Sequence, residues 1–70
     1  MTYQGYHNDH FCFRDENGKV VKFVKSRSDL IRDFKLFEKA NVNRRFIVKF
    51  FVLSFDFFDQ LIISDIVVND

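Results

Sequence analysis

Alternating apolar and polar positions predict two β-hairpins separated by a helix. Period-two alternation covers residues 10–24 and returns over residues 44–68, whereas residues 26–41 show helical spacing. This order predicts an α+β domain in which a four-stranded antiparallel sheet carries one helix packed on one face. The whole chain, 1–70, is expected to be one domain, and residues 1–9 form either a flexible lead-in or a short first strand.

The first hairpin has one clearly apolar face. A three-residue loop, "ENG", pairs Phe13 with Val21 and Phe11 with Phe23. A two-residue loop would slip this register by one residue and mix apolar with polar side chains. The Asn-Gly pair signals a hairpin, and the side-chain register favours the three-residue loop, with Gly18 in the left-handed region.

The helix is predicted from four apolar residues on one face: Leu30, Ile31, Phe34 and Phe37. Ser26 with Asp29, or alternatively Ser28, supplies the expected N-cap, and Asn41 is the expected C-terminal stop. Leu36 lies off the apolar face. We therefore expect Leu36 on the flank of the helix, at the rim of a binding surface.

The second hairpin is apolar on both faces. On its first strand one face carries Phe46, Val48, Phe50 and Val52, and the other carries Ile47, Lys49, Phe51, Leu53 and Phe55. On its second strand Leu61, Ile63 and Val67 alternate with Ile62, Ile66 and Val68. The intervening "DFFDQ" contains neither Gly nor Pro, so a bulge near residues 54–56 is an alternative to a simple turn.

An uncovered apolar face predicts binding to a partner, because one helix can cover only one face and monomers rarely expose large apolar patches. The predicted protein interface is Leu36, Ile47, Lys49, Phe51, Leu53 and Phe55. Its partner is another protein or a second copy in a homodimer. If the helix lay on the opposite face, the interface would be Phe46, Val48, Phe50 and Val52. A third alternative is a lid formed by the N-terminal segment with Tyr3 and Tyr6.

A membrane anchor is not favoured, although six of the eleven Phe lie within residues 46–63. A spanning helix needs about 20 mostly apolar residues with few charges. Lys49, Asp56 and Asp59 interrupt this run, and its alternation is that of a strand. The N-terminus lacks an apolar signal segment, and Cys12 is the single cysteine. These features predict a cytoplasmic protein.

The segment "HNDHFC" is the one cluster that suggests metal or thiol chemistry. His7, Asp9, His10 and Cys12 are metal-ligating residue types, but along a strand they divide between two faces. We interpret them as ordinary strand residues, with no metal or cofactor. The sequence also lacks an oriented Cys–His pair, a Gly-x-Ser-x-Gly motif and a phosphate-binding glycine loop. We therefore expect that the protein is not an enzyme.

Nucleic-acid binding is the alternative function. The net charge of +1, from 11 basic and 10 acidic residues, argues against a general polyanion binder. Basic and aromatic residues nevertheless alternate in "RRFIVKFF", as on sheets that stack bases. The candidate contacts are Lys22, Lys25, Arg44 and Arg45. The leading interpretation is a small accessory, regulatory or inhibitor protein, of the kind that phages and mobile elements encode.

Overall fold

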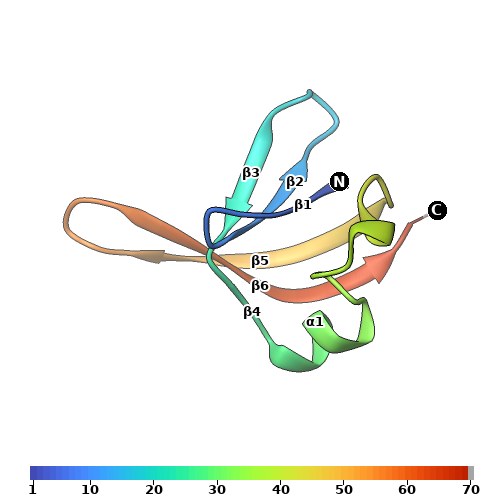
Figure 1. Ribbon diagram of the computed structural model, residues 1–70. Coiled ribbons are helices and arrows are strands. Elements are labelled where there is room, and N and C mark those ends of the chain that lie inside the picture. Colours follow the sequence, from blue (N-terminus) through green and yellow to red (C-terminus); the bar gives the residue numbers. More distant parts are fainter. Residues whose placement is uncertain (70) are drawn as a thin grey trace.

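Six strands and one short helix make up the computed structural model, which describes residues 1–69 (Figure 1). The strands are β1 (Thr2–His7), β2 (His10–Arg14), β3 (Val20–Phe23), β4 (Lys25–Ser26), β5 (Phe46–Ser54) and β6 (Asp59–Val68). The helix α1 (Ser28–Asp33) and a 3₁₀ turn, η1 (Lys39–Asn41), lie between β4 and β5. The α+β class is confirmed.

The strands form two sheets, so the prediction of a single four-stranded antiparallel sheet is wrong. The orders are β1-β2-β3 and β4-β6-β5, and β4 pairs with β6 in parallel. Two backbone contacts also connect the two sheets to each other. A bridge joins Thr2 on β1 to Arg45, and Val24, between β3 and β4, donates its N–H to the Leu61 carbonyl at 3.0 Å. The strands therefore follow one another around a small, partly closed barrel.

The N-terminal segment forms β1, which is one of the two alternatives predicted for residues 1–9. β1 pairs with β2 through a two-residue turn, Asn8 and Asp9, whose φ angles of 50° and 64° are those of a type I′ hairpin. A bulge lies between Tyr3 and Gly5, where Gly5 has φ 105°. β1 pairs with β2 on both sides of the bulge, from Thr2 to His7, and its first residues also reach the start of β5. The segment does not form the lid over the second hairpin that was one alternative.

The β2–β3 hairpin has the predicted register. Phe11 pairs with Phe23 and Phe13 with Val21. Gly18 is left-handed, with φ 82°, as the three-residue loop requires. The alternation of apolar side chains along both strands therefore decided the loop length.

The helix is much shorter than the predicted segment because it ends in a Schellman motif. Lys35 is left-handed, with φ 51°, and donates its N–H to the Arg32 carbonyl at 3.3 Å. Leu36 donates its N–H to the Ile31 carbonyl at 3.1 Å, which completes the motif. This reversal turns Leu36 into the core, where it is fully buried.

The predicted N-caps are also wrong. The N-cap residue is Arg27, which makes no side-chain cap hydrogen bond. Ser26 is instead the last residue of β4 and pairs with Ile63 on β6. The start of α1 is therefore determined by the parallel β4–β6 pairing. It is not determined by capping from a serine hydroxyl.

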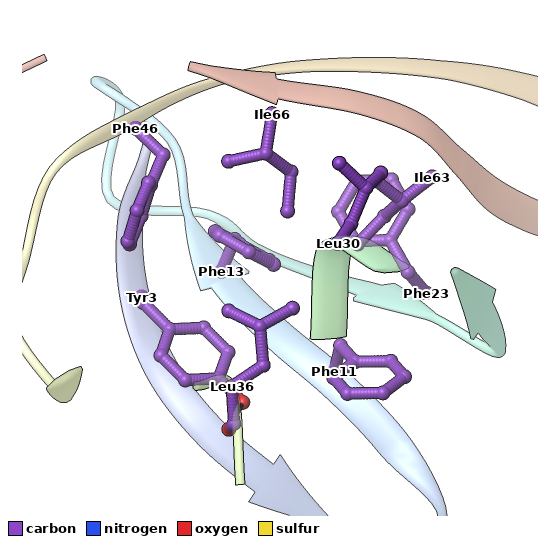
Figure 2. Close-up of a cluster of buried hydrophobic side chains, with 9 residues drawn as sticks. All are labelled: Tyr3, Phe11, Phe13, Phe23, Leu30, Leu36, Phe46, Ile63 and Ile66. Carbon is purple, nitrogen blue, oxygen red and sulfur yellow. Dashed lines mark hydrogen bonds between the residues drawn. The ribbon is translucent and has the colours of Figure 1, made fainter. Parts of the chain in front are cut away.

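The core is aromatic and lies between the two sheets and α1 (Figure 2). It consists of Tyr3, Phe11, Phe13, Phe23, Leu30, Leu36, Phe46, Ile63 and Ile66. The Phe13 ring packs against Tyr3 and Phe23 at centroid distances of 4.9 and 5.6 Å. Tyr3 donates its hydroxyl hydrogen to the Leu36 carbonyl. Burial, with smaller contributions from Cys12 and Tyr6, raises the pKa of Tyr3 to about 12.

A bulge in β6 changes which of its residues share a face. Lys49 pairs with Asp65 and Phe50 pairs with Ile63, so Ser64 has no partner on β5. The sequence pattern placed Ile63 and Ile66 on opposite faces, but the extra residue turns both into the core. The bulge thus lies on β6. It does not lie near residues 54–56, where the sequence pattern allowed a bulge as an alternative.

Candidate interaction surface

The end of the β5–β6 hairpin extends beyond the barrel (Figure 1). We call residues 50–61 the hairpin arm. Phe50 pairs with Ile63 and Val52 with Leu61, so the arm is a continuous two-stranded ribbon. Among the described residues, strand pairing joins the arm to the barrel at its base, where Val24 and Lys25 lie beside Leu61 and Ile62. The molecule is 37 Å in its longest dimension and 21 Å in its shortest.

One face of β5 is exposed along its whole length, and we call it the outer face. It consists of the residues Ile47, Lys49, Phe51, Leu53 and Phe55. Their four apolar side chains are 43–50% exposed, and Lys49 is exposed as well. These are five of the six residues in the predicted interface. These five residues are therefore exposed in the folded chain, and whether they form an interface stays a prediction.

The opposite face of β5 is only half covered. Phe46 is fully buried and Val48 is partly buried against the core, but Phe50 and Val52 are exposed. Phe50 touches the barrel through the Phe23 ring, at a centroid distance of 5.3 Å. The prediction that a helix covers this face holds only at its start, because α1 is too short to reach the hairpin arm. The arm is therefore apolar and exposed on both faces.

The tip of the hairpin arm is also aromatic. Phe55 and Phe58 stack on each other, with ring centroids 4.9 Å apart, and the Phe55 N–H donates to the Phe58 carbonyl. Phe57 between them is 97% exposed. The sequence pattern did not select Phe57 or Phe58. The signal was present in "DFFDQ", because two Phe flanked by Asp in a turn have no strand face to bury them.

Leu36 does not belong to this surface, so its placement at the interface rim is wrong. It is 1% exposed and lies in the core beside Tyr3. Its position off the apolar stripe of the predicted helix indicates a flank of that helix. The stripe itself ends at Lys35, where the backbone reverses, so helical spacing no longer applies to Leu36.

The charges of the hairpin arm are acidic. Asp56 and Asp59 flank the tip, and residues 50–61 contain no basic side chain. The lysine of the outer face, Lys49, lies directly opposite Asp65 on β6. A negatively charged arm repels phosphate groups.

The four predicted nucleic-acid contacts do not gather in one place. Lys25 pairs with Ile62, whereas the Arg45 carbonyl accepts the N–H of Asn69. Six residues of β6, 63–68, lie between Ile62 and Asn69, so the two positions are roughly 20 Å apart along the strand.

Two of the four basic residues also have charged or aromatic neighbours. Arg45 lines a surface hollow with Arg14, but Asp15 and Glu16 line the same hollow. Arg44 is half-buried, lies over the Phe46 ring at 5.5 Å and donates to the Asn41 side-chain oxygen at 3.1 Å. The remaining residue, Lys22, is exposed on β3 opposite Cys12.

The residues of "HNDHFC" stabilise their own hairpin. His7 hydrogen-bonds the Gln4 carbonyl at 2.9 Å, and His10 hydrogen-bonds the Asn8 carbonyl at 2.7 Å. Cys12 is buried, with its Sγ 3.7 Å from the His10 carbonyl. Across residues 1–69, no three His, Cys, Asp or Glu side chains are grouped so that they could hold a metal ion.

Comparisons of this chain with protein-family models, curated proteins and solved structures find no match. Within residues 1–69, no helix is long and apolar enough to cross a membrane.

Proposed function

We propose that this protein is a small, non-enzymatic interaction module that acts by self-association through the hairpin arm and the outer face of β5. The observation that carries the proposal is the exposure of apolar side chains on both faces and at the tip of the arm. A ribbon in a monomer does not need apolar side chains on both faces, because charged or polar residues would form the same hairpin. An accessory, regulatory or inhibitor role fits a protein that acts by occupying a surface.

The size of the exposed surface supports a specific interface. The arm carries five exposed Phe: Phe50, Phe51, Phe55, Phe57 and Phe58. At about 200 Å² for a whole Phe side chain, their exposed fractions amount to roughly 600 Å² per chain. A standard interface buries about 800 Å² per partner. The aliphatic neighbours Ile47, Val52 and Leu53 add to the aromatic area, so the arm is large enough for a stable contact.

The test is the molar mass in solution of the wild type and two matched variants, measured by sedimentation across the micromolar range. Phe51→Asp places a charge at the centre of the outer face. Val20→Asp places the same charge at an equally exposed apolar position on β3 of the barrel, where Val20 is 49% exposed. The wild type and Val20→Asp should associate, and Phe51→Asp should be monomeric and folded. A monomeric wild type would contradict the proposal.

The barrel favours nucleic-acid binding as a second candidate, by analogy of fold alone. Some small five-stranded barrels bind oligonucleotides on the outside of their second and third strands. In this chain β3 and β4 form nearly one strand, and the outside of β2 and β3 carries Arg14 and Lys22. Single-stranded DNA or RNA should then bind in a salt-dependent way that Lys22→Glu weakens. Absence of a mobility shift at low salt would remove this candidate.

A further inference from the structure

We infer that two copies of this chain pair through the outer edges of β5, antiparallel, about a two-fold axis at Phe51. The inference rests on the proposed self-association and gives it a geometry. The β4-β6-β5 sheet would continue into its copy, so the contact is closed and symmetric. Backbone hydrogen bonds would supply the register, and the apolar side chains of the arm would flank them.

The direction of the β5 backbone follows from two hydrogen bonds at the start of the strand. The Phe46 N–H donates to the Met1 carbonyl at 2.7 Å, away from β6. The Arg45 carbonyl accepts the Asn69 N–H at 2.9 Å, on the side of β6. Successive residues of a strand direct their N–H and C=O to alternate sides. The residues that direct these groups to the outer edge are therefore Val48, Phe50, Val52 and Ser54.

Within the described part of the chain, this outer edge has no partner strand. β5 is the last strand in the order β4-β6-β5. β1 reaches only the start of β5, through Met1, Thr2 and Tyr3 against residues 44–46. A long, flat, apolar edge is the usual template for adding another strand, and natural monomers protect such edges with charges, proline or bulges. Lys49 is the single charge within β5, and the bulge lies on β6 instead.

The sequence of the edge fits its own copy in one register. With the axis at Phe51, Val48 lies opposite Ser54 and Phe50 opposite Val52 of the second copy, so every outward N–H and C=O finds a partner. Lys49 lies opposite Leu53, which avoids a like-charge pair. An axis at Phe50 would require Phe46, whose backbone Met1 already occupies. An axis at Val52 would leave Val48 without a partner.

Disulfide trapping tests this register, in a Cys12→Ser background that removes the native thiol. Phe51 and its copy would form a pair without backbone hydrogen bonds, with Cα atoms about 4.5 Å apart, within the range that a disulfide spans. Leu53 and its copy would be about 13 Å apart, which is out of range. Under mild oxidation Phe51→Cys should therefore form a covalent dimer as its main product, and Leu53→Cys should remain monomeric. Equal cross-linking of both variants would overturn the register.

Amide hydrogen exchange of the wild type tests the same edge without any substitution. In the associated state the amides of Val48, Phe50, Val52 and Ser54 should exchange at least about tenfold more slowly than in a dilute sample. The amides of Ile47, Lys49, Phe51 and Leu53 already bond β6 and should be protected at both concentrations. An associated protein whose outward amides stay unprotected would overturn edge pairing but leave self-association intact. A protein that stays monomeric would overturn both.

Discussion

Phe13 and Phe57 are the same residue type in opposite surroundings. Phe13 is 0% exposed and packs against three other aromatic rings, whereas Phe57 is 97% exposed at the tip of the hairpin arm. The barrel and the arm are continuous along β5 and β6, so one pair of strands carries both environments. The difference separates apolar residues that fold the chain from apolar residues that remain available to a partner.

The barrel contains the contacts that a chain of this size needs to fold. Both sheets, α1 and the turn after it contribute to one core, and Tyr3 links β1 to the helix end through the Leu36 carbonyl. The arm adds its own ribbon hydrogen bonds but almost no burial. A two-stranded ribbon of this kind is only marginally stable by itself in water.

The largest effect is expected from truncating the same side chain in the two regions. Phe13→Ala should lower the free energy of unfolding by about 3–5 kcal/mol, because it removes a buried ring and leaves a cavity. A core of this size rarely supplies more than about 3–5 kcal/mol, so the variant should be largely unfolded. Phe57→Ala should change the stability of the monomer by less than about 0.5 kcal/mol. Urea unfolding followed by circular dichroism measures both, and similar losses would erase the distinction between barrel and arm.

The next effect is a loss of stability at alkaline pH that originates in the barrel. The unfolded chain releases the Tyr3 proton near its ordinary pKa of 10.0, whereas the folded barrel holds the pKa of Tyr3 at about 12. The contribution of Tyr3 to stability is therefore present well below pH 10 and falls progressively as the pH rises from about 10 to 12, by about 2 kcal/mol. Tyr3→Phe removes the titrating group and should show a shallower fall over this range. Equal slopes for the two proteins would show that Tyr3 is not the group responsible.

A smaller effect separates the two glycines. Gly5 has φ 105° in the bulge of β1, and a Cβ there would lie 2.9 Å from the His7 ring and 3.5 Å from Val42. Gly5→Ala should cost about 1–3 kcal/mol, because an L-residue is strained at this angle and the position is buried. Gly18 has φ 82° in a loop where a Cβ would meet nothing within 4 Å. Gly18→Ala should therefore cost less, about 1 kcal/mol, and thermal unfolding of both variants would reveal the order.

The sequence predicted those parts of the fold whose pattern is local. The β2–β3 register followed from four alternating apolar residues and an Asn-Gly loop. The exposure of Ile47, Phe51, Leu53 and Phe55 followed because nothing else in 70 residues is large enough to cover a second apolar face. Both predictions needed only side-chain period and the size of the chain.

The rest depended on backbone events that leave little trace in the sequence. Lys35 ends the helix in the left-handed region, although it is neither Gly nor Asn. Helical spacing therefore could not predict that Leu36 is buried. It also could not predict that a helix this short leaves Phe50 on β5 exposed. The bulge at Ser64 brings Ile63 and Ile66 to one face, which period two alone cannot show. The strand in residues 2–7 was one of two alternatives, because the bulge at Gly5 interrupts the alternation that would distinguish it from a flexible lead-in.

The concentration dependence of the unfolding temperature tests the division between barrel and arm most directly. Association stabilises the folded state by mass action, so the midpoint for the wild type should rise as its concentration increases. Phe51→Asp should unfold cooperatively at a midpoint that does not depend on concentration, because its barrel is intact and its outer face cannot associate. A wild-type midpoint that stays constant across the micromolar range, equal to that of Phe51→Asp, would contradict the claim that the arm is kept for a second copy.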